Sequence, residues 1–297
     1  MIKLNLGYPD NTILHKPKIL FAASEVAPLA KTGGLADVAG ELPHALKNMG
    51  CDVRIVLPFY GSISKNKFAI KPLITKIKIP VANSIYEEIN LYETEIFNNI
   101  PVYLISHDRY FNREGLYGSN KSDYPDNDKR FILFCRSVME MIPAINFIPD
   151  IIHTNDWQTG LIPLYLKNFY KYDKTYSVFT IHNLAYQGIF PHSSLEFAGI
   201  SDEYFNMDAL EFYGKISFIK SGIIYSDMIT TVSEQYSKEI QTREFGCGLD
   251  GLLRKKKHQL TGIINGIDYK IWDPGADSRI KSKYNEKNIN GKKNCKS

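Results

Sequence analysis

Long apolar runs, paired cysteines and an excess of one charge are all missing from this sequence of 297 residues. No apolar run approaches the roughly 20 residues of a membrane-spanning helix, so we expect no membrane partner. Lysines precede the apolar segment from Ile19 to Ala23, as in a signal peptide. Glu25 and Pro28 interrupt that segment before it resembles a signal-peptide core, and a first strand fits it better.

The cysteines argue against a zinc site. The chain has four of them, Cys51, Cys135, Cys247 and Cys295, and none forms a Cys-x-x-Cys pair. Free thiols are typical of a reducing compartment. We therefore expect a cytoplasmic protein that holds no metal.

The charge is nearly balanced. The formal net charge is +4, and lysines are dispersed along the chain until the last twenty residues. A nucleic-acid-binding domain usually carries its basic residues in one patch or stripe, so we expect no nucleic-acid partner. The length allows one large α/β domain or two small ones, with a substantial core.

The most informative segment is Lys31-Thr32-Gly33-Gly34-Leu35-Ala36-Asp37-Val38. It contains neither the dinucleotide fingerprint nor the phosphate loop of nucleoside triphosphatases. It lies between the apolar run 19–23 and a helical pattern over about 36–49, which predicts a strand, a glycine turn and a helix start. The glycines would let a ligand approach the backbone, with the helix N-terminus and Lys31 beside it and Asp37 one turn on. This favours a phosphate or sugar phosphate, and the alternative is an ordinary turn with a solvated lysine.

Strand and helix patterns alternate along the rest of the chain. Strands are expected at 18–23, 53–57, 151–153, 177–181, 228–232 and 262–264, and helices at about 36–49, 128–142, 159–169 and 215–225. Residues 62–105 read as a β-rich insertion, and residues 1–17 as a loose leader. Such alternation predicts an α/β fold with a doubly wound, mostly parallel, Rossmann-like sheet.

Polar residues follow each expected strand. They are Ser24-Glu25, His153-Thr154-Asn155-Asp156-Trp157, His182-Asn183, Ser233-Glu234 and Asn265-Gly266. Doubly wound sheets bind ligands beyond the carboxyl ends of their strands, so we expect a ligand-binding rim there. We also expect Lys31, Asp37, Asp156, His182 and Asn265 to converge on it.

Each of these segments also has a simpler interpretation. His153 and Asp156 have metal-ligand spacing but lack further ligands, and Asn155 or Asp156 could instead cap the helix that begins near Trp157. His182 could be a structural histidine at a strand end. Asn265-Gly266 could be a turn, and most of the aromatic residues could be core.

The segment from Ser24 to Val38 resembles the opening of bacterial glycogen synthases and plant starch synthases, which are retaining glycosyltransferases of the GT-B architecture. Four further stretches carry the resemblance, which runs from about Lys18 to Asn294. They are His153 to Trp157, Thr180 to Gly188, Phe212 to Gly222, and Ile264 to Asp268 with Trp272-Asp273-Pro274.

The resemblance implies transfer of glucose from ADP-glucose to the non-reducing 4-hydroxyl of an α-1,4-glucan (glycogen or starch) with retention, without metal or other cofactor. His182 and Asp156 would be the catalytic residues, His182 contacting the donor glucose. The implied donor-binding residues are Lys31, Gly33, Gly34, Asp37 and Asn265. The implied acceptor-binding residues are Tyr110, Tyr117, His153, Trp157 and Tyr186.

The resemblance also implies a boundary. Residues 18–280 would be the N-terminal GT-B domain and residues 281–297 the start of an interdomain linker. The C-terminal domain, which supplies an Arg/Lys pair and a glutamate, would be absent. We therefore expect a truncated or split form that is inactive alone, with a separate C-terminal half as partner. The alternatives are a non-catalytic glucan-binding module and an unrelated nucleotide-binding domain, and the sequence leaves ADP against UDP open.

Overall fold

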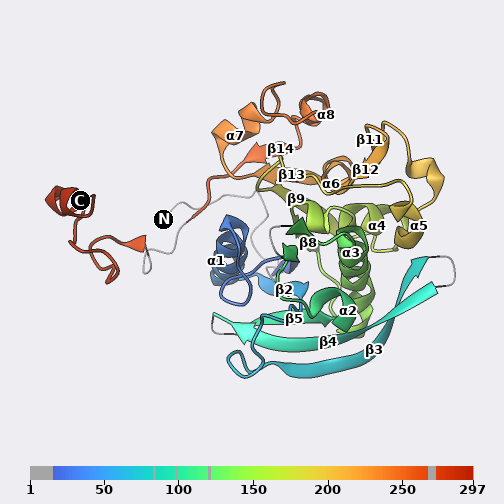
Figure 1. Ribbon diagram of the computed structural model, residues 1–297, viewed down its shortest axis with the longest axis horizontal. Helices are drawn as coiled ribbons and strands as arrows, with labels where there is room; N and C mark the ends of the chain where they lie inside the picture. Colours follow the sequence, from blue (N-terminus) through green and yellow to red (C-terminus); the bar gives the residue numbers. More distant parts are fainter. Residues whose placement is uncertain (1–15, 83–84, 98, 120–121, 267–271, 297) are drawn as a thin grey trace, which may run out of the picture.

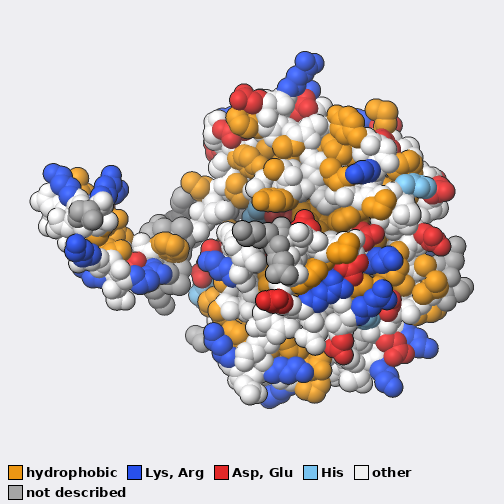
Figure 2. Space-filling view, in the orientation of Figure 1, with side chains coloured by type: hydrophobic (Ala, Val, Ile, Leu, Met, Phe, Trp, Pro, Cys, Tyr) orange, Lys and Arg blue, Asp and Glu red, His pale blue; other side chains and the backbone are white. Residues whose placement is uncertain are grey.

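The computed structural model describes residues 16–82, 85–97, 99–119, 122–266 and 272–296. Nearly all of the expected leader, residues 1–17, lies outside this range. Within it, no helix is both long and apolar enough to cross a bilayer. On the face drawn in Figure 2, the described lysine and arginine side chains are scattered among acidic ones instead of forming a stripe.

One large sheet organises the described part of the chain. Its nine strands run in the order β14-β13-β9-β8-β1-β2-β5-β4-β3. The six strands from β14 to β2, and β5 beside β2, pair in parallel, while β3 and β4 pair antiparallel. The strand bounds are β1 Lys18–Ala22, β2 Asp52–Pro58, β3 Lys71–Ala82, β4 Ile85–Ile96, β5 Ile100–Ser106, β8 Ile151–Asn155, β9 Tyr176–Ile181, β13 Met228–Thr231 and β14 Leu260–Gly262.

Helices cover both faces of this sheet, with α1 on one side of the central strands and α3 and α4 on the other (Figure 1). The helix bounds are α1 Gly34–Asn48, α2 Asp108–Phe111, α3 Asn127–Ala144, α4 Ile162–Asn168, α5 Ser194–Ala198, α6 Phe218–Tyr225, α7 Glu234–Glu239, α8 Asp250–Lys255 and α10 Asn290–Asn294. Short 3-10 turns are η1 Trp157–Thr159 and η2 Asp202–Tyr204. The doubly wound fold predicted from the sequence is therefore confirmed.

Burial explains why the central strands read as continuous apolar runs. Leu20, Phe21 and Ala22 of β1 are fully buried, because helices cover both faces of the sheet. Ile55 and Leu57 of β2 are equally buried on the neighbouring strand. This core fixes the strand ends, from which the polar loops of the rim emerge.

The β-rich segment extends the main sheet instead of forming a separate unit. Strand β5 lies parallel to β2, and the long hairpin of β3 and β4 continues the sheet beyond it. The sequence pattern indicates strands here but not their partners, since pairing depends on which edge is free. The edge itself lies far from the carboxyl ends of β8 and β9 (Figure 1).

Three element boundaries were wrong. The helix expected over 215–225 begins only at Phe218, because 215–217 form β12, which pairs with β10 and β11. Ser217 then caps α6 by accepting a hydrogen bond from Lys220 N at 3.3 Å. The helix expected from 159 starts at Ile162, after the turn η1. The last strand lies at Leu260–Gly262, two residues before its expected place. Small two-residue strands complete the structure: β6 Gly118–Ser119, β7 Ser122–Asp123, β10 Ile189–Phe190 and β11 Glu211–Phe212.

Candidate active site

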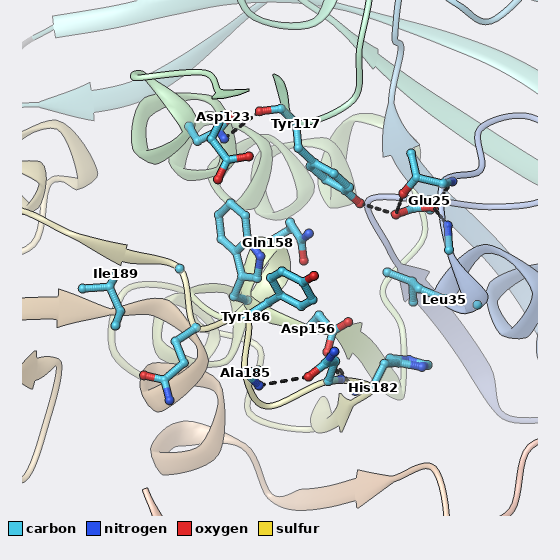
Figure 3. Close-up of a pocket in the computed structure, with 18 of the residues that line it drawn as sticks. Glu25, Leu35, Tyr117, Asp123, Asp156, Gln158, His182, Ala185, Tyr186 and Ile189 are labelled. Carbon is cyan, nitrogen blue, oxygen red and sulfur yellow. Dashed lines mark hydrogen bonds between the residues drawn. The ribbon is translucent and has the colours of Figure 1, made fainter. Parts of the chain in front are cut away.

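A cavity of about 870 Å³ lies beyond the carboxyl ends of the central strands (Figure 3). Its walls come from the loop after β1, from Tyr117 and the residues around Tyr124, and from the ends of β8 and β9 with the loop that follows β9. The lining residues are Glu25, Thr32, Gly33, Gly34, Leu35, Tyr117, Asp123, Tyr124, Asn127, Asp156, Trp157, Gln158, His182, Asn183, Ala185, Tyr186, Gln187, Gly188, Ile189, Phe190, Val232 and Asn265.

Glu25 holds the glycine loop in place. Its carboxylate is almost fully buried and accepts hydrogen bonds from Thr32 N at 2.5 Å, Thr32 Oγ1 at 2.6 Å and Gly33 N at 3.1 Å. Tyr117 donates its hydroxyl to the same carboxylate at 2.7 Å (Figure 3). The backbone N–H groups of Thr32 and Gly33 are therefore hydrogen-bonded within the protein. Those of Gly34 and Leu35 lie at the start of α1, where N–H groups have no intrahelical acceptor.

The two glycines of the loop border open space. A Cβ atom added at Gly33 or Gly34 would meet no heavy atom within 4 Å. Gly33 has a φ of −143°, an extended conformation that any residue adopts. The fold itself therefore does not require glycine at either position. A ligand that approaches the backbone from the cavity would require it.

Lys31 and Asp37 pair with each other at the edge of this loop. Lys31 Nζ lies 2.5 Å from Asp37 Oδ1, and both side chains are about half exposed, at 49% and 47%. Neither residue lines the cavity as it stands. An ion pair this exposed contributes roughly 0–1 kcal/mol, so an anionic ligand could compete for the lysine.

Asp156 is buried and held in an unusual backbone conformation. Its φ of 55° lies in a region that residues other than glycine rarely adopt. Oδ1 of its carboxylate accepts from His182 N at 2.8 Å and from Asn183 N at 3.4 Å. Burial raises its pKa to about 7, although these two amides act in the opposite direction. A strained, buried carboxyl group that titrates near neutrality in a cavity is typical of a functional site.

His182 stands beside Asp156 at the end of β9. Its Nε2 lies 2.9 Å from Asn155 Oδ1, at the end of the neighbouring strand β8. Burial lowers its pKa to about 4, against a smaller rise due to the charge of Glu25. The ring is therefore neutral at pH 7, and it lines the cavity.

Comparison with known proteins agrees with this geometry. Residues 18–255 match the family described as the starch synthase catalytic domain. This chain belongs to that family. It is 46% identical over 271 residues to a glycogen synthase of Geotalea daltonii, and 45% identical over 278 residues to one of Syntrophotalea carbinolica. These alignments cover 90% and 92% of the chain but 56% and 57% of those relatives.

A solved structure is similar over the same region. The catalytic domain of starch synthase IV from Arabidopsis thaliana, bound to ADP and acarbose, matches with a TM-score of 0.83 at 31% identity. The match covers 94% of this chain and 57% of that one. The family resemblance of the sequence is confirmed, and the chain spans a little over half the length of the relatives it matches.

The starch synthase fold brings most of the candidate residues together. Eight of the candidates line the cavity described above, namely Gly33, Gly34, Tyr117, Asp156, Trp157, His182, Tyr186 and Asn265. Asn265 is exposed, and residues 267–271 that follow it lie outside the described part of the chain. The hydroxyl of Tyr117 points to Glu25 and Ser24. Tyr186, at 67% exposure, is the most accessible of the aromatic lining residues.

Two candidates lie behind the cavity wall. Tyr110 is 1% exposed and packs edge-on against Phe197, so it belongs to the core. His153 points to a neighbouring strand, with Nε2 2.7 Å from Thr180 Oγ1 and its ring 4.7 Å from that of Phe21. Burial, with a smaller contribution from His182, lowers the pKa of His153 to about 3. Neither residue lines the cavity.

Trp157 forms part of the floor. Its ring packs edge-on against Phe131 at 4.9 Å and lies 5.5 Å from Phe190. Gly188 passes directly over it with a φ of +58°, and a Cβ there would come within 2.5 Å of the indole. This glycine is therefore required by the fold, in contrast to Gly33 and Gly34.

The simpler interpretations of the strand-end segments are partly excluded. Neither Asn155 nor Asp156 caps a helix with its side chain. The Asn155 side chain contacts Ala22 of β1 and His182, and the Asp156 carboxylate accepts from His182 N. No group of three or more potential metal ligands occurs among the described residues.

Sequence reasoning missed several lining residues. From the sequence, Glu25 was only one of the polar residues that follow the first strand. In the structure its carboxylate holds the glycine loop. Gln158 and Gln187 are buried, line the cavity and each have a side-chain Oε1 without a hydrogen-bond partner in the described structure. Gln187 lies in the stretch Thr180 to Gly188 that carries the family resemblance, and Gln158 directly follows Trp157, but neither glutamine was given a role.

Proposed function

We propose that the whole protein is a glycogen (starch) synthase, which transfers glucose from ADP-glucose to the non-reducing 4-hydroxyl of an α-1,4-glucan with retention. One observation carries the proposal: open space beside Gly33 and Gly34 faces the same cavity as Asp156, His182 and Asn265. Open space at a helix N-terminus and polar groups in the same cavity are what a nucleotide sugar needs at its two ends. Relatives named glycogen synthases, and a relative bound to ADP and acarbose, support it.

The donor phosphates would lie against the glycine loop. The N–H groups of Gly34 and Leu35, with the positive end of the α1 dipole behind them, would donate to the diphosphate. Lys31 would leave Asp37 to add a full charge, and Asn265 would approach from the end of β14. These groups would stabilise the charge that develops on the departing diphosphate, and electrostatic stabilisation of this kind usually contributes more to catalysis than any other single effect.

The sugars would lie against the other wall. His182 would contact the donor glucose, and the carboxyl group of Asp156 would accept or share a hydrogen bond near the reacting centre. Trp157, Tyr117 and Tyr186 would contact the acceptor glucan, since aromatic faces stack on sugar rings. Because Tyr110 is buried in the core and His153 contacts Thr180 outside the cavity lining, their part in acceptor binding would be indirect.

We further propose that this chain supplies one side of the active site. Its relatives are nearly twice as long as the region matched. A C-terminal half would then complete the donor pocket, either in the same polypeptide or as a separate partner. The described residues carry no feature that selects ADP over UDP, so the nucleotide preference is left to experiment.

A transfer assay with a matched binding assay tests the proposal. The protein with a C-terminal half restored is incubated with labelled ADP-glucose and glycogen, and incorporation of label into glycogen is measured. Incorporation that depends on His182 and Asp156 is the expected result. Retention of the protein on glycogen without any incorporation would instead indicate a non-catalytic glucan-binding module.

A further inference from the structure

Asn155 occupies a position between two strands that fixes the orientation of its amide. It ends β8, is 1% exposed, and donates its Nδ2 to Ala22 O of β1 at 3.0 Å. Its Oδ1 lies 2.9 Å from His182 Nε2. A flipped amide would place an oxygen against the carbonyl oxygen of Ala22, which has no hydrogen to donate. Ala22 therefore decides which end of the amide faces His182.

The oriented amide in turn decides the state of the imidazole. Because Asn155 Oδ1 can only accept, His182 Nε2 must carry a hydrogen. In a neutral imidazole the other nitrogen, Nδ1, is then a pure acceptor. No described residue donates a hydrogen bond to Nδ1, and the ring lines the cavity.

We infer that Asn155 is a positioning residue, which holds His182 as the Nε2–H tautomer so that Nδ1 accepts a hydrogen bond from a hydroxyl group of the bound ligand. The tautomer follows from the contacts of Asn155 alone. That the hydroxyl belongs to a sugar depends on the proposed function.

His153 shows why an amide is needed. It lies on the same strand as Asn155, but its Nε2 faces the hydroxyl of Thr180, which can donate or accept. That hydroxyl in turn shares a 2.6 Å contact with Thr230 Oγ1, which is equally ambivalent. The contacts of His153 therefore leave its tautomer open, whereas those of His182 do not.

The titratable groups around His182 are Glu25, Asp156 and His153. Asp156 contacts the backbone N–H of His182, not its ring. Glu25 favours the charged imidazole weakly, and burial outweighs it. A carboxylate in place of the Asn155 amide would lose the hydrogen bond to Ala22 O but would still accept from Nε2, and its full negative charge at that distance would favour the imidazolium form.

The tautomer can be measured on residues 1–297 themselves. Two-bond ¹H–¹⁵N correlation spectra of histidine-labelled protein distinguish the two neutral tautomers and the imidazolium. The His182 signals are assigned by their absence in His182→Phe. We expect the Nε2–H tautomer at pH 7, a mixture of tautomers in Asn155→Leu, and a raised His182 pKa in Asn155→Asp. Thr180→Val is the matched control, because it removes the partner of His153 and should leave the His182 tautomer unchanged.

A Nδ1–H tautomer or an imidazolium in the wild-type spectrum at pH 7 overturns the inference, and this result needs no variant to fold. An unchanged tautomer in a folded Asn155→Leu variant overturns it as well, because another group would then fix the ring.

The functional half is tested in the protein with a C-terminal half restored. The imidazolium cannot accept at Nδ1, so kcat/KM of Asn155→Asp should fall about tenfold per pH unit below its raised His182 pKa. Asp156 titrates near pH 7 in both proteins, so the quantity compared is the ratio of the Asn155→Asp to the wild-type kcat/KM, which should fall with pH in this way. A merely structural defect would lower kcat/KM at every pH and contradict the inference. Absence of any transfer in the wild-type protein would contradict the proposed function, while the tautomer result would stand.

Discussion

The two walls of the cavity are built differently. The glycine loop after β1 is partly exposed and leaves open space beside Gly33 and Gly34. It also carries the exposed Lys31–Asp37 ion pair, from which an anionic ligand could take the lysine. At the ends of β8 and β9, Asn155 and Asp156 are buried and His182 is half-buried, and both Asn155 and Asp156 form hydrogen bonds with His182. An open, charged wall suits a ligand that brings its own charge. A wall of side chains fixed by hydrogen bonds suits hydroxyl groups whose direction must be recognised.

The largest expected effect concerns whether these two walls are enough. We expect purified residues 1–297 to show no transfer of glucose from ADP-glucose to glycogen, because in the proposed function a C-terminal half supplies further groups that grip the diphosphate. The measurement is label incorporated into glycogen, with the protein carrying a restored C-terminal half as control. Turnover near the typical enzyme range of roughly 1 per second or faster by residues 1–297 alone would show that both walls suffice.

The second effect is the pH dependence of the free energy of unfolding, to which Asp156 of the β8–β9 wall contributes. The pKa of Asp156 is raised from 3.8 to about 7 in the folded state. The folded protein thus binds more protons than the unfolded chain between these values, so this group destabilises the fold progressively as pH rises from about 4 to 7. Asp156→Asn should remove that trend, by an amount on the order of a few kcal/mol. Denaturant unfolding of both proteins across this range measures it.

Asp227→Asn is the control of opposite sign. Although burial acts to raise the pKa of Asp227, hydrogen bonds from Ser177 and the ion pair with Lys167 leave it lowered. Its stabilising contribution is therefore present above its ordinary value of 3.8 and lost only as pH falls below it, so Asp227→Asn should keep the wild-type trend between about pH 4 and 7. The same trend in both variants would mean that the Asp156 carboxyl is not buried as described.

The third effect concerns the positive charge of Lys31 on the glycine-loop wall. Lys31→Ala should reduce transfer about ten- to hundredfold in the protein with a C-terminal half restored, since a charge-assisted hydrogen bond contributes roughly 1.5–3 kcal/mol. Stability should change little, because the pair with Asp37 is exposed. Steady-state kinetics provide the measurement. Lys71→Ala, on the distant strand β3, is the control, and equal kinetics in the two variants would make Lys31 a solvated lysine.

The smallest effect tests the open space itself. Gly34→Ala should leave stability unchanged or raise it by about 0.4–1 kcal/mol, because alanine restricts the unfolded chain and meets nothing in the fold. Affinity for ADP-glucose should nevertheless fall, since the methyl group enters the space reserved for the ligand. Thermal unfolding and calorimetric titration measure the two quantities.

Gly251→Ala in α8 is the matched control for this test. A Cβ there has only the flexible end of Arg254 within 4 Å, at 3.9 Å. It should give the same gain in stability with no change in affinity. If Gly34→Ala binds ADP-glucose as well as Gly251→Ala does, the phosphates do not lie against the loop.

Several features of the site could be predicted from the sequence because of one geometric rule. The carboxyl ends of parallel strands meet at the same edge of a sheet, so residues after β1, β8, β9 and β14 were expected to meet, and Gly33, Asp156, His182 and Asn265 line one cavity. The rule places residues at an edge but does not direct their side chains. Tyr110 packs into the core, and the side chain of His153 faces Thr180 of β9 instead of the cavity.

The sequence by itself determined the alternating strands and helices, the strand-end loops and the family, since these depend on local periodicity and on motifs that are contiguous in the chain. Only the tertiary structure decided that Glu25 holds the glycine loop, that Lys31 pairs with Asp37, and that Ala22 orients the amide that fixes His182. These contacts join residues whose distance and direction are set by the packing of several strands at once. A hydrogen bond needs that direction as well as the right residue types, and sequence spacing does not contain it.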